Sequence, residues 1–166
     1  MGAEPKQNEG AFVVRKFHAE DAAGASEILL QAREAANWSG QALTEFMLLP
    51  EALALISERG GMPTGFILGR MMADEAEILN LAVCEEYRRQ GEGRALLVEL
   101  LRRFAESGVS RVFLEVRESN RGAIEFYERM GFRRSGRREG YYREPQEEAL
   151  VYERTQESTS LVLNTS

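Results

Sequence analysis

The stretch from residue 80 to 104, NLAVCEEYRRQGEGRALLVELLRRF, constrains the fold of this 166-residue chain more than any other. It begins as an apolar strand, crosses a short charged loop at 85–90, and enters a helix through Gly91 and Gly93. Apolar residues at helical spacing give this helix one buried face: Leu97, Leu100, Leu101 and Phe104. A strand that turns through glycines into an amphipathic helix is typical of an α/β domain.

The glycine turn before this helix has the features of an anion-binding site. The first N–H groups of a helix lack intrahelical partners, and the helix dipole adds partial positive charge there. Glycines allow the backbone to curl so that several N–H groups converge, and Arg88, Arg89 and Arg94 add positive charge. The predicted ligand is a phosphate or pyrophosphate, although the spacing fits neither a P-loop nor a Rossmann fingerprint. A glycine-containing helix cap without a ligand is the alternative interpretation.

Size, charge and cysteine content narrow the class of protein. A chain of 166 residues is long enough for one domain with a real core. The net charge of −6 argues against binding to nucleic acid or to a membrane surface and is compatible with a basic peptide partner. Cys84 is the only cysteine, which excludes an internal disulfide and predicts a cytoplasmic protein. No apolar run reaches transmembrane length, no metal-ligand cluster is present, and the single histidine, His18, is predicted to be a surface or capping residue.

Hydrophobic periodicity and turn signals predict a mixed α/β (α+β) fold with about seven strands and four helices. The expected order is β-α-α-β-β-β-α-β-α-β-β. The strands are expected near 12–17, 53–58, 64–72, 76–83, 110–118, 132–142 and 149–153, and the helices near 18–35, 41–48, 91–107 and 120–130. Residues 11–154 are therefore expected to form the single domain, with a flexible N-terminus at 1–10 and a disordered tail at 155–166.

Two residues in this pattern allow more than one interpretation. Asn80 interrupts an apolar strand, where an amide costs free energy unless it is hydrogen-bonded. It marks a bulge, faces a ligand, or is a satisfied core amide. Trp38 is the only tryptophan and falls in a loop at 37–40, where it is either part of the core or lines a substrate groove.

The pattern Arg88-x-x-Gly91-x-Gly93 resembles the acyl-CoA loop of the GNAT acetyltransferases, and the predicted element order is the order of that family. Between residues 77 and 152, the segments ILNLAV, EYRRQGEGRALL, FLEVRESN, AIEFYERMGF and YYREP are similar to the bacterial ribosomal-protein-alanine N-acetyltransferases. The resemblance implies acetyl transfer from acetyl-CoA, without a metal, to the N-terminal alanine of a small-subunit ribosomal protein. It also implies a monomer or weak oligomer. A lysine side chain or a small-molecule amine as acceptor, or a non-catalytic CoA-binding module, are the alternatives.

The same resemblance assigns roles to individual residues. Those expected to contact acetyl-CoA are the strand residues Leu81, Ala82 and Val83, the pyrophosphate-loop residues Arg89, Gln90, Gly91, Glu92, Gly93 and Arg94, and Asn120. Glu115 corresponds to the proton acceptor and Tyr127 to the proton donor, while Tyr141 and Tyr142 resemble a tyrosine pair near the peptide groove. Glu92 departs from the family pattern, in which an apolar residue is usual at this position of the loop. A carboxylate there opposes the charge of the ligand unless it points to solvent.

The expected chemistry explains these residue types. An α-ammonium group has a pKa of about 8 and must lose a proton before its nitrogen can attack a thioester. A carboxylate such as Glu115 can accept that proton, directly or through water, and a tyrosine hydroxyl can protonate the leaving thiolate. Spacing alone favours a Glu115 paired with an arginine such as Arg117, and a Tyr127 that is simply core. Direct attack needs no covalent intermediate, so Cys84 is expected to be a bystander.

Overall fold

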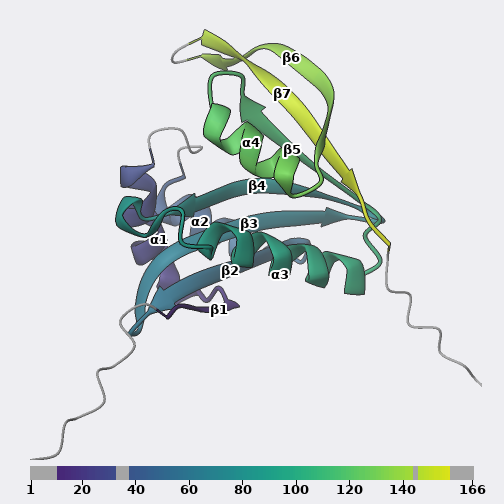
Figure 1. Cartoon of the computed structure of the whole chain (residues 1–166). Coiled ribbons are helices and arrows are strands. Elements are labelled where there is room, and N and C mark those ends of the chain that lie inside the picture. Colours follow the sequence, from purple (N-terminus) through teal and green to yellow (C-terminus); the bar gives the residue numbers. More distant parts are fainter. Residues whose placement is uncertain (1–10, 33–37, 144–145, 158–166) are drawn as a thin grey trace, which may run out of the picture.

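The computed structural model describes residues 11–32, 38–143 and 146–157, and its elements follow the predicted order (Figure 1). The strands are β1 (Val13–Lys16), β2 (Ala52–Arg59), β3 (Met62–Met72), β4 (Glu75–Val83), β5 (Arg111–Arg117), β6 (Arg133–Arg143) and β7 (Gln146–Thr155). The helices are α1 (Ala22–Gln31), α2 (Gly40–Met47), α3 (Glu92–Glu106) and α4 (Arg121–Arg129), with short 3-10 turns at η1 (Ala19–Asp21) and η2 (Glu85–Tyr87).

The seven strands form one mixed sheet in the order β1-β2-β3-β4-β5-β7-β6. All neighbouring pairs are antiparallel except β4 and β5, which are parallel. α3 and α4 cover the front of the sheet in Figure 1, and α1 and α2 lie behind it. Since α3 connects β4 to β5, the helix start and the two parallel strands belong to one β-α-β unit.

Two apolar cores lie on opposite faces of the sheet, and alternation along the strands divides the side chains between them. In β2, Leu55 packs under α3, whereas Ala54 and Ile56 pack under α1 and α2. The front core contains the predicted face of α3 together with Leu96, which is also fully buried. On the outer face of α3, Glu99 and Arg103 lie four residues apart and form an ion pair at 2.9 Å.

A β-bulge in β4 changes which face its residues occupy. Ile78 pairs with Gly69 of β3, but Asn80 pairs with the adjacent Leu68, so that Leu79 is an extra residue. Ile78 accordingly belongs to the front core, whereas Ala82, four residues later, belongs to the rear core. Of the three interpretations offered for Asn80, a bulge is observed one residue earlier, and Asn80 itself is buried and has an interaction partner.

β4 and β5 separate beyond the bulge. Their parallel pairing runs from Glu75 opposite Arg111 to Ile78 opposite Leu114. β4 continues to Val83, paired with β3 alone, and β5 continues to Arg117, paired with β7. The two facing strand edges therefore leave a gap that widens toward the start of α3, and this gap opens toward the left in Figure 1.

The two ends of the chain differ in part from expectation. Residues 1–10 and 158–166, expected to be flexible, lie outside the described residues, as does the expected extension of the first helix over 33–35. The predicted start of the C-terminal tail, residue 155, is too early, because Thr155 is the last residue of β7. Gln156 is also fixed, since its N–H donates to Ser110 and its amide donates to the carbonyl groups of Leu101 and Val109.

Gly69 allows α3 to approach the sheet closely. A Cβ at this position would lie 2.5 Å from Phe104 Cζ and 3.3 Å from Leu100 Cδ2, and both side chains are fully buried. We expect Gly69→Ala to lower the free energy of unfolding by about 1–3 kcal/mol through overpacking. Urea denaturation measures the change. Gly122→Ala in α4, where nothing lies within 4 Å of the added Cβ, is the control and should be neutral or slightly stabilising.

Candidate active site

The predicted anion loop lies where β4 passes through η2 into α3. Gly91 is the N-cap of α3 and has φ of 90°, which favours glycine because it has no Cβ. Arg89 also has positive φ, at 61°. Ala95 is the first residue whose N–H bonds back to the loop, donating to the Gly91 carbonyl at 3.0 Å. The first helical N–H groups are therefore available to an anion at this point, beside the exposed Arg89 and Arg94.

Glu92 occupies a position that neither expectation for it described. It points neither to solvent nor toward a ligand, because its side chain is 0% exposed and pairs with Arg59 Nε at 2.6 Å. The Ser57 hydroxyl donates to its second oxygen at 3.2 Å. The charge of Glu92 is therefore neutralised beneath the loop by an arginine of β2.

The edge of β4 and the start of α4 form the other borders of the gap. Leu81 and Val83 lie on the front side after the bulge, packed against the front core, and Arg88 Nε donates to the Val83 carbonyl at 3.1 Å. Asn120 caps α4, with its side-chain oxygen accepting from the Ala123 N–H at 3.1 Å. This bond to the side-chain oxygen also fixes the orientation of the Asn120 amide group. The contact of Asn120 with CoA stays a prediction.

Glu115 lies at the point where the gap opens, directly after the last residue of β5 that pairs with β4. Its side chain is 14% exposed and forms an ion pair with Arg138 Nε at 2.9 Å. The predicted alternative partner, Arg117, instead pairs with Glu147 at 3.5 Å. Tyr141 faces the same carboxylate, and its interaction with Glu115 is the main reason why the pKa of Tyr141 is raised.

A bulge in β6 brings Arg138 and Tyr141 to the same carboxylate. Arg138 pairs with Ala149 of β7 and Tyr142 pairs with Glu147, so four steps along β6 match two along β7. Gly140, with φ of 59°, lies inside the irregular segment. Both predicted groove tyrosines therefore lie around Glu115. Tyr142 stacks on the Arg117 guanidinium at 4.0 Å, and burial raises its pKa.

Tyr127 is a core residue of the front face. Its ring makes edge contacts with Phe126 and Phe132 at centroid distances of 5.1 and 5.5 Å. Burial raises the pKa of Tyr127 well above its usual value, so its hydroxyl stays protonated throughout the neutral range. The core position expected from spacing is therefore observed, and a catalytic role for the hydroxyl remains a prediction.

The two faces of the gap carry different groups. Leu114 and Val116 point into the front core, so Glu115 and Arg117 point to the rear. On the front are the anion loop, Asn120 and α4, while the rear carries carboxylate, guanidinium and phenol groups. α1 and α2 make their contacts with β2, β3 and β4, beside this rear surface. The arrangement can therefore hold an extended phosphate-bearing molecule from one side and a basic group from the other.

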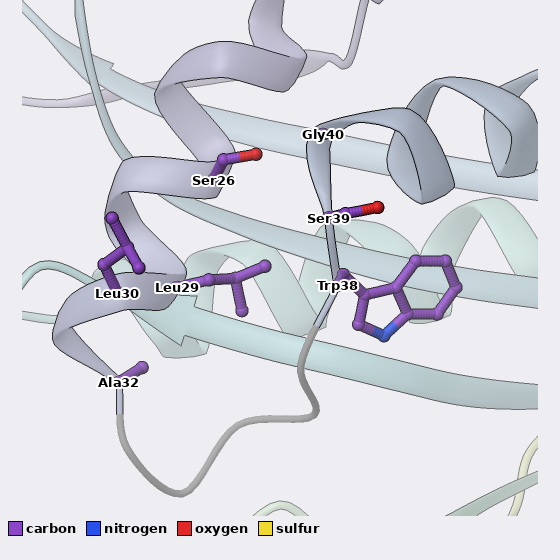
Figure 2. Close-up of a pocket in the computed structure, with 7 residues that line it drawn as sticks. All are labelled: Ser26, Leu29, Leu30, Ala32, Trp38, Ser39 and Gly40. Atoms are coloured by element: carbon purple, nitrogen blue, oxygen red, sulfur yellow. The ribbon is translucent and has the colours of Figure 1, made fainter.

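A hollow of about 410 Å³ lies between the end of α1 and the start of α2 (Figure 2). Leu29 points across it toward the segment that carries Trp38. Trp38 is half-buried and packs edge-on against Phe46 at 5.3 Å, so it both packs on a core residue and lines the hollow. The lining residues are Ser26, Leu29, Leu30, Ala32, Trp38, Ser39 and Gly40.

Cys84 and His18 have structural positions. Burial raises the pKa of the Cys84 thiol, which keeps it protonated and a poor nucleophile. His18 is exposed and is the N-cap residue of η1, and its backbone N–H donates to Asp21. In the ranges 11–32, 38–143 and 146–157, no helix is long and apolar enough to cross a membrane. The same ranges contain no group of three acidic, histidine or cysteine residues that could bind a metal.

Sequence reasoning missed two arginines of the site, Arg59 and Arg138. Both are distant in sequence from the carboxylates that they neutralise, so spacing gives no direct signal. One signal for Glu92 was present, because it precedes Leu96 and Leu100 at four-residue intervals and therefore lies on the buried face of α3. A buried carboxylate needs a cation, which predicts a partner on the sheet below.

The comparisons with known proteins agree with this geometry. A sequence profile of the Acetyltransferase (GNAT) family matches residues 20–132, more than half of the chain. The ribosomal protein bS18-alanine N-acetyltransferase of Escherichia coli (strain K12) is 42% identical over 84 residues, 51% of this chain and 57% of that protein. In sequence, the match thus spans less than two thirds of that relative.

Solved structures cover more of the chain. The crystal structure of the ribosomal-protein-S18-alanine N-acetyltransferase from Escherichia coli superposes with a TM-score of 0.80 at 29% identity, over 92% of this chain and 99% of that one. Ard1 from Thermoplasma volcanium also gives 0.80 at 29% identity, over 87% and 97%. The profile match and the shared fold together show that the chain belongs to the GNAT acetyltransferase family.

Proposed function

We propose that the protein transfers the acetyl group of acetyl-CoA to the N-terminal amine of a protein, with the N-terminal alanine of a small-subunit ribosomal protein as the preferred acceptor. The observation that carries the proposal is the position of Glu115, which lies where β4 and β5 separate and faces the side opposite the anion loop. A carboxylate at this point can take a proton from an amine that enters from the rear. The names of the two Escherichia coli relatives supply the acceptor.

The gap fits acetyl-CoA. The free edge of β4 at Leu81, Ala82 and Val83 can pair with the amides of the pantetheine arm, as a neighbouring strand would. The loop of Arg89, Gln90, Gly91, Gly93 and Arg94 offers N–H groups and positive charge for the pyrophosphate. Glu92 does not oppose that charge, because Arg59 neutralises it. Acetyl-CoA supplies an activated thioester, and the protein provides orientation and proton transfer.

Glu115 accepts a proton from the acceptor ammonium, which has a pKa of about 8 and is mostly charged at neutral pH. The freed nitrogen forms a bond to the acetyl carbon. As the carbon–sulfur bond breaks, its electron pair stays on sulfur and the nitrogen gives up its second proton to water. Tyr127 serves as the donor to the leaving sulfur. Because a thiol has a pKa of about 8.5 and the pKa of Tyr127 is raised, complete transfer from Tyr127 is uphill. We therefore assign most of its contribution to a hydrogen bond that stabilises the developing thiolate.

Arg138 competes with the acceptor for Glu115 in the free protein. Its side chain is 59% exposed, so this ion pair is worth no more than about 1 kcal/mol. We expect Arg138→Ala to lower the KM for a peptide acceptor by about two- to fivefold, because the ammonium no longer displaces an arginine. Arg137→Ala, on the same strand but paired with Glu118 and Glu148, is the control and should leave KM unchanged. A higher KM in Arg138→Ala would mean that Arg138 contacts the acceptor itself.

Mass spectrometry of a peptide with two amines tests the proposal. The peptide begins with alanine, carries one internal lysine, and is incubated with acetyl-CoA and the purified protein. Acetyl on the N-terminal amine alone is the expected result. Acetyl on the lysine would assign another acceptor class to the same fold, and no transfer despite measurable binding of acetyl-CoA would contradict an N-terminal peptide acceptor. A peptide whose N-terminus is already acetylated is the control for lysine reactivity.

A further inference from the structure

A buried ion pair lies directly beneath the anion loop. Arg59 Nε is 2.6 Å from Glu92 Oε1, and the two side chains are 8% and 0% exposed. Ser57 donates to the other carboxylate oxygen, so both oxygens of Glu92 are satisfied by residues of β2. Because Glu92 is the first residue of α3, the pair attaches the start of the helix to the sheet at the point where the helix meets the loop.

The same guanidinium also contacts η2, the loop itself and the segment before β1. It lies over the ring of Tyr87, the last residue of η2, at 4.5 Å, and over the ring of Phe12 at 5.5 Å. Arg59 Nη2 donates to Gln90 Oε1 at 3.3 Å, and Gln90 Nε2 donates in turn to the Glu86 carbonyl at 3.1 Å. One side chain thus contacts the last residue of η2, the loop residue Gln90 and the first residue of α3.

Stability alone does not account for this arrangement. Removing two charges from water costs several kcal/mol per ion, and a well-packed apolar pair of similar volume is often as stable as a buried ion pair. An apolar residue at position 92 would continue the buried stripe of Leu96 and Leu100. What an ion pair adds is direction, because the planar fork of an arginine fixes the groups that it contacts.

We propose that Arg59 and Glu92 are positioning residues for the acetyl-CoA loop. The pair holds residues 88–94 so that the first N–H groups of α3 converge on the pyrophosphate, and it removes the charge of Glu92 from the face that Arg89 and Arg94 present to the ligand. The inference rests on the proposed function, since it assumes that this loop binds the pyrophosphate of acetyl-CoA. It adds residues of β2, outside the loop itself, to the determinants of that affinity.

Two variants separate positioning from stability. Arg59→Lys keeps a positive charge near Glu92 but removes the fork that reaches Gln90 and the flat surface that stacks on Tyr87. The double variant Arg59→Leu/Glu92→Leu removes both charges together and is expected to fold with little change in the thermal midpoint. For both we expect the Kd for acetyl-CoA, measured by isothermal titration calorimetry, to rise about tenfold or more. The KM for the peptide at saturating acetyl-CoA should stay unchanged.

The matched control is the exposed ion pair on the outer face of the same helix. Glu99→Gln breaks the bonds to Arg102 and Arg103 and should leave the Kd for acetyl-CoA at the wild-type value. A wild-type Kd in both Arg59 variants would overturn the inference while the proposed function stands. A folded wild-type protein that does not bind acetyl-CoA would instead contradict the proposed function. The Kd could also be raised in Arg59→Lys but equal to the wild-type value in the double variant. That result would mean that the pair contributes only packing, which also overturns the inference.

Discussion

Glu115→Gln is expected to lower kcat/KM for a peptide acceptor by about 10²–10⁴-fold at pH 7, the usual range for loss of a general base. Glutamine keeps the shape and the polarity of the side chain, but it cannot take a proton from an ammonium group. The fold should tolerate the change, because the lost partner, Arg138, is largely exposed. Steady-state kinetics with saturating acetyl-CoA measure the effect.

The pH dependence identifies the role of the lost group. Above a pH of about 8 the acceptor amine loses its proton to solvent, so the defect of Glu115→Gln should narrow as the pH rises from 7 to 9. Glu153→Gln is the matched control, because Glu153 is also a strand carboxylate that pairs with an arginine, Arg111, at 3.1 Å. It should keep wild-type activity. A defect of constant size across this range would assign Glu115 to acceptor binding instead of proton transfer.

Local patterns predicted the elements of this fold well because their causes are local. Leu97, Leu100 and Phe104 lie on the buried face of α3 as their spacing indicates, and Asn120 caps α4 as its residue type favours. The bulge at Leu79 was harder to place. A bulge is defined by the register between two strands, and Asn80 marked only its neighbourhood. The gap between β4 and β5 follows from that register and from the pairing of β5 with β7. The sequence of a single strand does not indicate which strands it pairs with.

The site shows the same division. Glu115 and the glycine loop were proposed from sequence because each belongs to a short motif. The arginines that pair with these carboxylates were not predicted. Arg138 of β6 reaches Glu115 across β7, and Arg59 of β2 reaches Glu92 at the start of α3. For Glu115, the nearest arginine in sequence, Arg117, was the wrong partner. Residues two apart on a strand have side chains on the same face, which favoured Arg117. The bulge in β6 instead places Arg138 beside Glu115.

Gly91→Val is expected to raise the KM for acetyl-CoA about 10²-fold. Gly91 has φ of 90° and ψ of 0°, a conformation that a β-branched residue avoids. A Cβ there would meet nothing within 4 Å, so the effect is conformational and not a clash with the protein. Relaxation of residue 91 toward negative φ rotates the adjoining peptide planes and turns N–H groups away from the pyrophosphate. Initial rates at varied acetyl-CoA measure the change.

The other end of α3 provides the matched control. Gly108 has φ of 88°, and a Cβ added there also meets nothing within 4 Å. Gly108→Val should therefore cost a similar free energy of unfolding, about 1–3 kcal/mol, without changing the KM for acetyl-CoA. A difference between the two variants in KM, at equal loss of stability, isolates the loop as the binding element. Equal KM values would mean that the N-terminus of α3 does not bind the pyrophosphate, and the assignment of this loop would be wrong.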